Sequence, residues 1–373
     1  MIVLHESRHL QEPGFFRTLF RALQRSEANV RIQEERPFPR ASDERGMHDG
    51  AWISWDGARV FVDMSDHVFQ FDPIALREAD LYLKANLHRG VAAKVFAEKG
   101  LVDPGDRLQP YTFLAPGLPR CRQIRRVLSL SGIRRRLRRP GTICHVVGVY
   151  ENLKRDGESI PAEGEVLSPS QMHFWIRQEF AETLRERAMP GSTVRLVSRG
   201  NPAIEDGRWV LPNLSYRRFL LSILRADALV LNTFPHALYP WKAFEAVALG
   251  VPVVAEMSPL VECPSRYQLR AGSEMAEVLP GVGDFDRNLP LSNPASYRVL
   301  RWPGREALRE GIASVLDEVK KPESWQERRR GVHRFSKEQL SDCGIAKNFR
   351  GWVDGKLAAS NERVNPVGSF VES

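Results

Sequence analysis

Apolar and polar positions along the chain follow patterns that alternate between helix and strand. The clearest example spans residues 216–256, where an apolar-periodic segment at residues 216–224 precedes four consecutive apolar residues at 228–231. Such a short apolar run is typical of a strand buried on both faces. After a loop, the pattern predicts a helix at residues 241–249 and a strand at residues 251–255.

Residues that favour helix ends flank the helix at 241–249. Pro240 stands where a first helical turn tolerates a missing N–H, and Gly250 follows the last periodic residue, as helix C-termini commonly require. The same reasoning predicts further elements. Strands are expected at residues 1–4, 52–55, 59–62, 79–84, 142–149 and 194–197, with a hairpin turn at Asp56-Gly57, and helices at residues 15–23, 172–188, 305–319 and in parts of 325–352.

Alternating strands and helices predict parallel sheets and therefore an α/β fold. The chain has 373 residues, which is long enough for two domains. Pro and Gly residues surround a basic stretch in the first half of the chain, which indicates a linker. We therefore expect a first domain at residues 1–116, a basic linker at 117–141, a second domain at 142–325, a helical segment at 326–355 and a tail at 356–373.

Lys242 and Glu245 share one face of the predicted helix at residues 241–249, close to its N-terminus. Ligands of parallel sheets bind beyond the carboxyl ends of the strands, where helix N-termini present free N–H groups. A cation beside such an N-terminus suits a diphosphate, and a carboxylate one turn deeper suits the two hydroxyls of a ribose. The alternative is an ordinary ion pair on the helix surface, which would stabilise the helix by only ~0.2–0.5 kcal/mol.

The segment from Lys242 to Val254 resembles the donor-binding segment of the two-domain GT-B glycosyltransferases. After Lys242 it contains Glu245-Ala246-Val247-Ala248-Leu249-Gly250-Val251-Pro252-Val253-Val254. The pattern in that superfamily is a basic residue followed by Glu-Ala-x-Ala-x-Gly-x-Pro-Val-Val. The resemblance implies an α/β fold of two Rossmann-like domains facing across a cleft, with the acceptor on the first domain, the nucleotide sugar on the second and a last helix that returns to the first. It also implies that Glu245 binds the ribose and that Lys242 faces the phosphates.

One difference from the superfamily concerns stereochemistry. Many retaining members carry a second acid eight residues before the glutamate, and that position is Ala237 here. The polar residues nearby are Asn232, Thr233 and His236. The spacing between Lys242 and Glu245 is more similar to that of exostosin-like transferases, and Ala-Asp-Leu-Tyr-Leu-Lys at residues 79–84 resembles a phrase in their N-terminal half. The sequence leaves retention and inversion both open.

An inverting transferase needs a base beside the acceptor, because the attacking hydroxyl loses its proton. Acidic residues follow two predicted strands of the first domain. In order of preference the candidate bases are Asp66, Asp63 and Glu6, with His5 and His67 beside them. The alternative for Asp63 and Asp66 is an Asx-turn or a helix cap, since aspartate is enriched at both.

Further donor contacts are expected around the loop that precedes the helix at 241–249. They are Asn232, Tyr239 and Trp241, together with Arg199 at the end of another predicted strand, where the alternative is a turn-stabilising arginine. The helix N-terminus and Lys242 can stabilise the charge of a leaving nucleoside diphosphate without a metal. Asp284-Phe285-Asp286 falls in a late Gly- and Pro-rich loop and is no Asp-x-Asp metal site. We therefore expect neither a cofactor nor a metal.

The chain has a net charge of +8 and a pI of about 9.5. Nine arginines and no acidic residue lie between Arg120 and Arg139. This stretch fits a solvated linker, a surface for anionic membranes or for a lipid-linked diphosphate acceptor, or a nucleic-acid contact. The apolar residues that could make it a short amphipathic helix on a bilayer are Ile124, Val127, Leu128, Leu130, Ile133 and Leu137. Nucleic acid is the least favoured partner, because no helix-turn-helix, zinc-finger or RNP pattern is present.

Cysteine usage and the N-terminus bear on the compartment. The four cysteines, Cys121, Cys144, Cys263 and Cys343, form no Cys-x-x-Cys pair, which is typical of a reducing cytoplasm. The N-terminal residues have no signal-peptide pattern, and no run of ~18 apolar residues exists. We expect a cytoplasmic protein that is at most peripheral on the inner face of the membrane.

The sequence therefore predicts a glycosyltransferase that moves a sugar from a nucleotide sugar to a saccharide or lipid-linked acceptor, in surface polysaccharide biosynthesis. Two alternatives stay open. One is a sugar-nucleotide epimerase of the same architecture. The other is a non-catalytic basic adaptor for membranes or nucleic acids, which the missing second acid at Ala237 would suit.

Overall fold

The computed structural model describes residues 1–5, 13–27, 29–33, 50–65, 68–112, 114–131, 137–149, 160–167, 169–198, 210–211, 214–232, 241–255, 262, 264, 267–269, 273–278 and 300–364. The chain forms two compact units. Unit 1 comprises residues 1–116, 262–267 and 339–373, and unit 2 comprises residues 117–261 and 268–338. The first segment of unit 1 ends at Pro116, and the basic stretch that follows belongs to unit 2.

Unit 1 contains a six-stranded sheet in the order β2-β1-β3-β4-β5-β6. Neighbouring strands are parallel except for β3, which is antiparallel to both β1 and β4. The β3–β4 hairpin turns at Asp56 and Gly57, whose φ angles of 48° and 94° are those that a two-residue I′ turn requires. The strands are β1 (Ile2–His5), β2 (Val30–Gln33), β3 (Gly50–Trp55), β4 (Ala58–Asp63), β5 (Leu81–Ala85) and β6 (Leu108–Tyr111).

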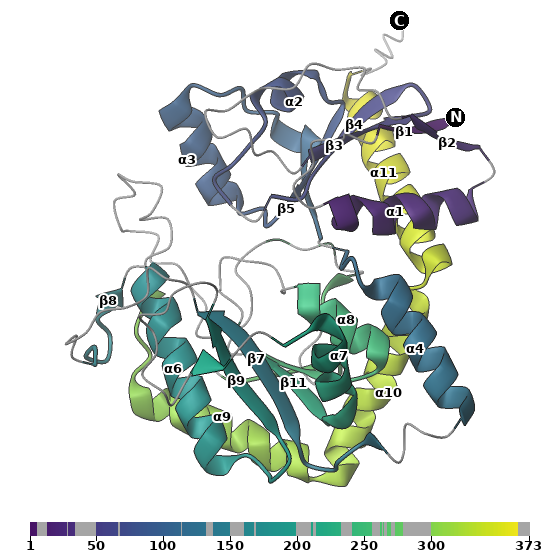
Figure 1. Cartoon of the computed structure of the whole chain (residues 1–373). Helices are drawn as coiled ribbons and strands as arrows, with labels where there is room; N and C mark the ends of the chain where they lie inside the picture. Colours follow the sequence, from purple (N-terminus) through teal and green to yellow (C-terminus); the bar gives the residue numbers. More distant parts are fainter. Residues whose placement is uncertain are drawn as a thin grey trace, which may run out of the picture. The chain divides into compact units, whose positions relative to one another are not determined.

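Helices cover both faces of this sheet. The crossover β1–α1–β2 runs toward one edge, and the crossovers β4–α2–β5 and β5–α3–β6 run toward the other, so right-handed connections put α1 opposite α2 and α3. Helix α11 packs along α1 (Figure 1). Trp55 Nε1 donates to Asp354 of α11 at 2.6 Å. The helices are α1 (Pro13–Ser26), α2 (Pro73–Glu78), α3 (Arg89–Lys99) and α11 (Asp342–Val364), with a 3-10 turn η1 (Gly105–Arg107) before β6.

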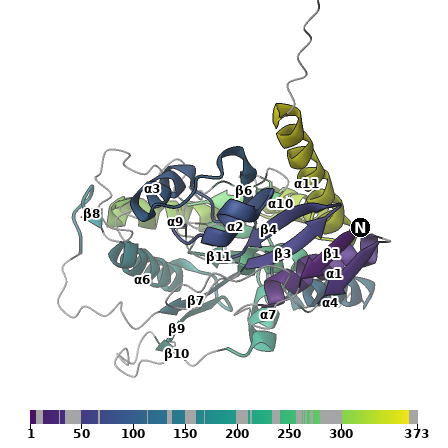
Figure 2. The same cartoon turned by 90° about the horizontal axis from the view of Figure 1, so that it is seen from above.

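Unit 2 contains a second six-stranded sheet, in the order β10-β9-β7-β11-β12-β13, and every neighbouring pair is parallel. Numbered within this sheet, the order is 3-2-1-4-5-6, which is that of a Rossmann fold. Figure 2 shows β10 beside β9 at one edge. The strands are β7 (Ile143–Val149), β9 (Thr193–Ser198), β10 (Val210–Leu211), β11 (Ala228–Leu231), β12 (Val253–Ala255) and β13 (Met275–Glu277), and β8 (Val166–Leu167) pairs separately with β14 (Leu300–Arg301).

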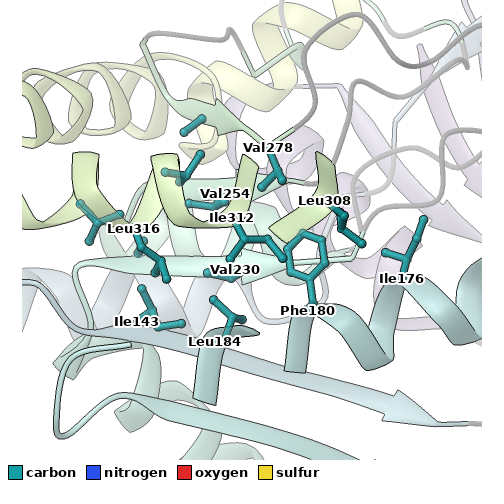
Figure 3. Packing of buried hydrophobic residues seen from close by; sticks show 14 of the residues in the cluster. Ile143, Ile176, Phe180, Leu184, Val230, Val254, Val278, Leu308, Ile312 and Leu316 are labelled. Carbon is teal, nitrogen blue, oxygen red and sulfur yellow. The ribbon is translucent and has the colours of Figure 1, made fainter. Parts of the chain in front are cut away.

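The main core of unit 2 lies between this sheet and two helices, α6 and α9. Val230 of β11 and Val254 of β12 pack there against Phe180 of α6 and Ile312 of α9 (Figure 3). Helices α7 and α8 contact the strands of this sheet as well, and α4 and α10 pack on α8. The helices are α4 (Leu118–Ser131), α6 (Pro169–Arg187), α7 (Tyr216–Arg225), α8 (Trp241–Leu249), α9 (Arg305–Lys320) and α10 (Pro322–Glu338).

The predicted α/β class and its two Rossmann-like units are confirmed. Helix 241–249 and strand 228–231 have the predicted bounds. Gly250 has a φ of 78°, its N–H donates to Val247 O, and the N–H of Val251 donates to Ala246 O, each at 2.9 Å. This Schellman arrangement ends α8 and needs the left-handed backbone that glycine supplies. Pro240 lies outside the described residues.

Other bounds differ from the prediction. The strand after α8 begins at Val253 rather than at residue 251, and Pro252, which has no N–H to donate, precedes it. Helix α11 continues to Val364, so the first part of the predicted tail is helical. Short elements with little periodicity were not predicted, namely β2, β6, β8, β10, β13, β14, α2 and α3.

The arginine-rich stretch begins with helix α4, which packs against α8 within unit 2. Leu118 and Cys121 are fully buried on this helix, whereas Val127 is 57% exposed. Helix α4 therefore covers the first part of the predicted amphipathic segment, as far as Ser131, and Ile133 lies outside the described residues. None of the described helices combines the length and the apolar composition that crossing a bilayer requires.

Two helix glycines give opposite predictions for substitution by alanine. A Cβ on Gly311 of α9 would lie 2.3 Å from the carbonyl oxygen of Val278, whereas a Cβ on Gly355 of α11 would meet no described atom within 4 Å. Gly311→Ala should destabilise the protein by about 1–3 kcal/mol, because the backbone must move. Gly355→Ala should stabilise it by about 0.5–1 kcal/mol through helix propensity. Urea denaturation of both variants tests this, and equal effects would contradict the packing of α9 on β13.

Candidate functional site

The two central strands of unit 2 separate at their carboxyl ends. β7 and β11 pair at only two positions, Ile143 with Ala228 and Cys144 with Leu229. Pairing between β7 and β9, in contrast, continues to Val149. The connections leave in opposite directions from β7 and β11 in a sheet of this strand order, and ligands bind at that switch point. The divergence therefore marks the switch point of this sheet, at the carboxyl ends of β7 and β11.

Lys242 extends from the first turn of α8 to this switch point. The N–H of Asp227 donates to the carbonyl of Thr142 at 2.8 Å, so Thr142 faces β11. Alternation along β7 turns the carbonyl of Val146 toward the same side. There it accepts a hydrogen bond from Lys242 Nζ at 3.3 Å, in the place where a ladder bond from β11 would otherwise form.

Two aromatic rings flank the Lys242 ammonium. Its Nζ lies 5.4 Å from the ring centroid of Phe219 and 5.7 Å from that of Trp241. Rings at this range attract a cation by ~0.5–1 kcal/mol or more when it is desolvated. The ammonium is thus held at the switch point beside the N-terminal end of α8, where a phosphate-bearing ligand would meet both the charge and the helix N–H groups.

His145 of β7 is a second side chain at the switch point that can carry a positive charge. It is fully buried, its ring is stacked on Phe180 with a centroid distance of 6.0 Å, and Nδ1 lies 3.1 Å from the carbonyl oxygen of Val230, which makes Nδ1 the donor. Burial lowers the pKa of His145 from 6.5 to about 4, so the ring is neutral at pH 7. Of these two side chains, Lys242 is therefore the one that carries positive charge at neutral pH.

Glu245 lies in the interior rather than on the helix surface, so it does not form the surface ion pair considered from the sequence. It is 1% exposed, and its Oε1 accepts a hydrogen bond from the Tyr216 hydroxyl at 2.5 Å. Burial raises the pKa of Glu245 from 4.5 to about 7, although the Tyr216 hydroxyl, the Lys242 charge and the Gly117 N–H oppose this. Among the described residues, Glu245 Oε2 has no hydrogen-bond partner. A ligand hydroxyl would satisfy it.

Gly117 closes over this carboxyl group. A Cβ at this position would lie 1.9 Å from both Glu245 Oε1 and the Tyr216 hydroxyl oxygen. Cys121, one turn along α4, is buried in the same cluster, and burial raises the pKa of its thiol to about 12. Gly117 is the first residue of unit 2, so the start of this unit is packed directly on the predicted ribose-binding glutamate.

The other predicted donor residues are only partly described. Asn232 directly follows β11 and is buried, and Trp241 begins α8. The structure therefore brings Asn232, Trp241, Lys242 and Glu245 together around one strand and one helix. Tyr239 and Arg199 lie outside the described residues, as does Ala237.

Of the three candidate bases, only Asp63 is described, and Asp66 and Glu6 lie outside the described residues. Asp63 ends β4 and is buried. Its Oδ2 accepts from the Tyr82 hydroxyl at 2.6 Å, and its Oδ1 accepts from Lys84 Nζ at 3.2 Å and from the N–H of Ser65 at 2.8 Å. The Ser65 contact is the Asx-turn considered from the sequence. A role for Asp63 as a base stays a prediction and would require these contacts to open.

Tyr82 and Lys84 of the Asp-Leu-Tyr-Leu-Lys segment both contact the carboxylate of Asp63. Lys84 is fully buried and lies 5.5 Å from the ring centroid of Phe71. Burial, followed by the charge of Asp63, raises the pKa of Tyr82, so its hydroxyl keeps its proton and donates to the carboxylate. The phrase thus supplies the partners of a buried carboxylate, which would be costly to bury alone.

Sequence reasoning missed Tyr216, His145 and the contact role of Gly117. Tyr216 lies in the apolar-periodic segment at residues 216–224, and its partner Glu245 is 29 residues away. Gly117 is one of the Pro and Gly residues that indicate a linker beside the basic stretch. No local pattern reports either contact, because both depend on the packing of α4 and α7 beside α8.

Comparison with known proteins adds a fold likeness at low similarity. No family model and no curated protein matches the chain. Among solved structures it is similar to Anabaena Alr3699/HepE in complex with UDP-glucose, at 11% identity and a TM-score of 0.40 over 78% of this chain and 71% of that chain. It is also similar to a Listeria monocytogenes protein described as a putative UDP-N-acetylglucosamine 2-epimerase. The identity is 15% and the TM-score 0.31, over 76% of this chain and 62% of that chain. A third similar structure is the wall teichoic acid polymerase TagF. The identity is 11% and the TM-score 0.26, over 78% of this chain and 60% of that chain.

The close approach of Gly117 to Glu245 predicts a non-additive pair of substitutions. Gly117→Ala should cost more than ~2 kcal/mol of stability, since the methyl group displaces a buried hydrogen-bonded pair. The same substitution should cost less than half as much in a Glu245→Ala background, where the obstructing carboxyl group is absent. Urea denaturation of the two single variants and the double variant measures the coupling, and additive costs would contradict the contact.

The raised pKa of Glu245 predicts a pH-dependent penalty. Below pH 4.5 the carboxyl is protonated in both the folded and the unfolded chain. As pH rises through about 7, the folded protein must bury a charge, which costs on the order of 3 kcal/mol. Glu245→Gln keeps an acceptor for Tyr216 but cannot ionise, so its stability relative to the natural protein should increase between pH 5 and pH 8. Urea denaturation at both pH values tests this, and a difference independent of pH would contradict it.

Proposed function

We propose that this chain is a glycosyltransferase of the GT-B kind that uses a nucleotide sugar as its donor. The observation that carries the proposal is the placement of two groups on one helix. Lys242 Nζ lies at the β7–β11 switch point, and Oε2 of buried Glu245, one turn further along, has no hydrogen-bond partner among the described residues. A cation and a hydroxyl acceptor at this separation match the diphosphate and the ribose of one ligand.

The diphosphate would lie against the N-terminal end of α8. Lys242 Nζ donates to the Val146 carbonyl at 3.3 Å and lies over two ring faces, and phosphate oxygens would take the place of that carbonyl. The ammonium and the helix N–H groups would stabilise the charge that develops on the departing nucleoside diphosphate. We propose that no metal is needed for this step.

The ribose would engage the carboxyl group of Glu245. Oε1 is occupied by Tyr216, and Oε2 is the atom left to accept a hydroxyl hydrogen. Because the pKa of Glu245 is raised to about 7, the carboxylate form that accepts two hydrogen bonds should increase in population with pH. Asn232, Trp241, Tyr239 and Arg199 are proposed as further donor contacts.

The acceptor would be a saccharide or a lipid-linked sugar held by unit 1. If the reaction inverts the anomeric centre, Asp66, Asp63 or Glu6 would take the proton of the attacking hydroxyl. Asp63 is tied to Tyr82 and Lys84, which favours Asp66 or Glu6 for that role. The arginine-rich stretch from Arg120 to Arg139, with exposed Val127, would suit an acceptor presented at an anionic membrane surface.

A thermal-shift screen tests the donor site. A nucleotide or its sugar, from the UDP, GDP, CMP and dTDP series, should raise the melting temperature by several degrees at ~100 times its Kd, equivalent to about 2.7 kcal/mol. Lys242→Ala and Glu245→Ala should each lose this shift. Lys320→Ala, which removes a lysine beside Gly141 at the start of β7, should keep it. The shift should also persist in EDTA.

Turnover then separates the possible enzymes. Transfer of the sugar to an added saccharide or lipid-linked acceptor is expected. Conversion of the donor sugar without any acceptor would indicate an epimerase instead. Absence of a shift with every nucleotide would contradict the proposal and favour a non-catalytic adaptor.

A further inference from the structure

Unit 2 has a cavity at the ends of β11 and α8 that lie away from the switch point. It has a volume of about 230 Å³ and is lined by Arg125, Arg138, Arg329 and His333 around Asp227. Asp227 precedes β11, and Gly250, which also lines the cavity, follows α8. Because α8 separates Gly250 from Lys242 by eight residues, the two sites lie about 12 Å apart along its axis.

The cavity brings three arginines and one carboxylate together. Arg138 pairs with Asp227, and Arg329 Nη2 lies 2.9 Å from the same carboxylate. These two arginines therefore have a structural role at the start of β11. Arg125, in contrast, contacts the Ala248 carbonyl at 3.5 Å and the His333 ring. One carboxylate thus faces three guanidinium groups.

A groove continues from this cavity along α10. It has a volume of about 470 Å³ and shares Arg329 and His333 with the cavity. Arg330, Arg334 and Lys337 line it at intervals of three and four residues, so they lie on one face of the helix. Each is exposed, and none has an ion-pair partner within the described part of the chain.

Other arginines of unit 2 are treated differently. Arg305 and Arg309 of α9 pair with Glu179 of α6, and Arg328 pairs with Glu318. Acidic residues therefore face the arginines between α6 and α9. The lining of the cavity, in contrast, includes one acid, Asp227, and the lining of the groove includes one acid, Glu338. Such segregation indicates that the counter-charge comes from a ligand.

We propose that this cavity and groove, named here the basic groove, form a second binding site for a ligand that carries two or more phosphate groups. Guanidinium groups bind phosphate oxygens in a bidentate manner, which suits phosphate more than an isolated carboxylate. The stretch from Arg329 to Lys337 spans about 12 Å, which matches several linked phosphates rather than one. The phosphates could belong to a soluble polyphosphate or to a lipid headgroup. The site does not depend on the proposed transferase activity.

Two probes distinguish these sources. Tripolyphosphate is titrated calorimetrically at low salt, and co-sedimentation is measured with vesicles of phosphatidylglycerol and phosphatidylcholine against vesicles of phosphatidylcholine alone. The groove variant is Arg330→Gln/Arg334→Gln/Lys337→Gln. The control variant, Arg185→Gln/Arg187→Gln/Lys321→Gln, removes the same charge from exposed positions on α6 and at the end of α9.

We expect at least one probe to bind roughly tenfold or more weakly to the groove variant, and as tightly to the control variant as to the natural protein. Loss with tripolyphosphate identifies a soluble ligand, and loss with the vesicles alone identifies a lipid headgroup. Either result supports the site, and the nucleotide shift should be unchanged in the groove variant. If neither probe binds, or if the control variant loses as much affinity, the proposal is overturned. Should the triple variant fold poorly, the single exposed substitution Arg334→Gln decides the question.

Discussion

The divergence of β7 and β11 beyond Cys144 is the constraint on which the candidate site depends. In a parallel sheet of this order the chain leaves the two central strands in opposite directions, and the strands stop pairing before their carboxyl ends. Backbone groups in that gap still need partners, because a buried carbonyl without one is costly. Lys242 supplies the partner of Val146, and His145 supplies that of Val230. Side chains thereby donate the hydrogen bonds that backbone N–H groups of a paired strand would donate. Unlike a backbone N–H group, a side chain can turn from the carbonyl to a ligand.

Burial of Glu245 follows from the same packing. Helix α8 is enclosed by the sheet, α4, α7 and α10, so its motif glutamate has no aqueous surface. The fold offsets part of the desolvation cost with Tyr216 and Gly117, and Oε2 has no partner in the part of the chain that the structure describes. A group kept in this state is destabilising in the empty protein, which is the usual cost of a site preorganised for a ligand. The start of α4 rests directly on this carboxyl group, so the site and the entrance of the chain into unit 2 are mechanically linked.

Electrostatics divides unit 2 into regions with different tasks. Buried or paired charges on α6 and α9 stabilise the core face of the sheet. Lys242 lies at the switch point between β7 and β11, whereas the basic groove carries a row of exposed cations on α10. The net charge of +8 is therefore not spread evenly. The arginine-rich stretch of the sequence contributes Arg125 and Arg138 to the cavity, and α10 contributes the cations of the groove.

The sequence alone determined the elements with strong patterns. The apolar run at 228–231, the helix between Pro240 and Gly250 and the Asp56-Gly57 hairpin follow from local burial, capping and turn chemistry. These elements define the α/β class and place Lys242 and Glu245 on one helix. Tertiary structure decided what those residues contact. It buried Glu245 beneath Gly117, tied Asp63 to Lys84, and joined α4 to α10 around Asp227. Those contacts link residues far apart in the chain, and local periodicity carries no information about which distant faces meet.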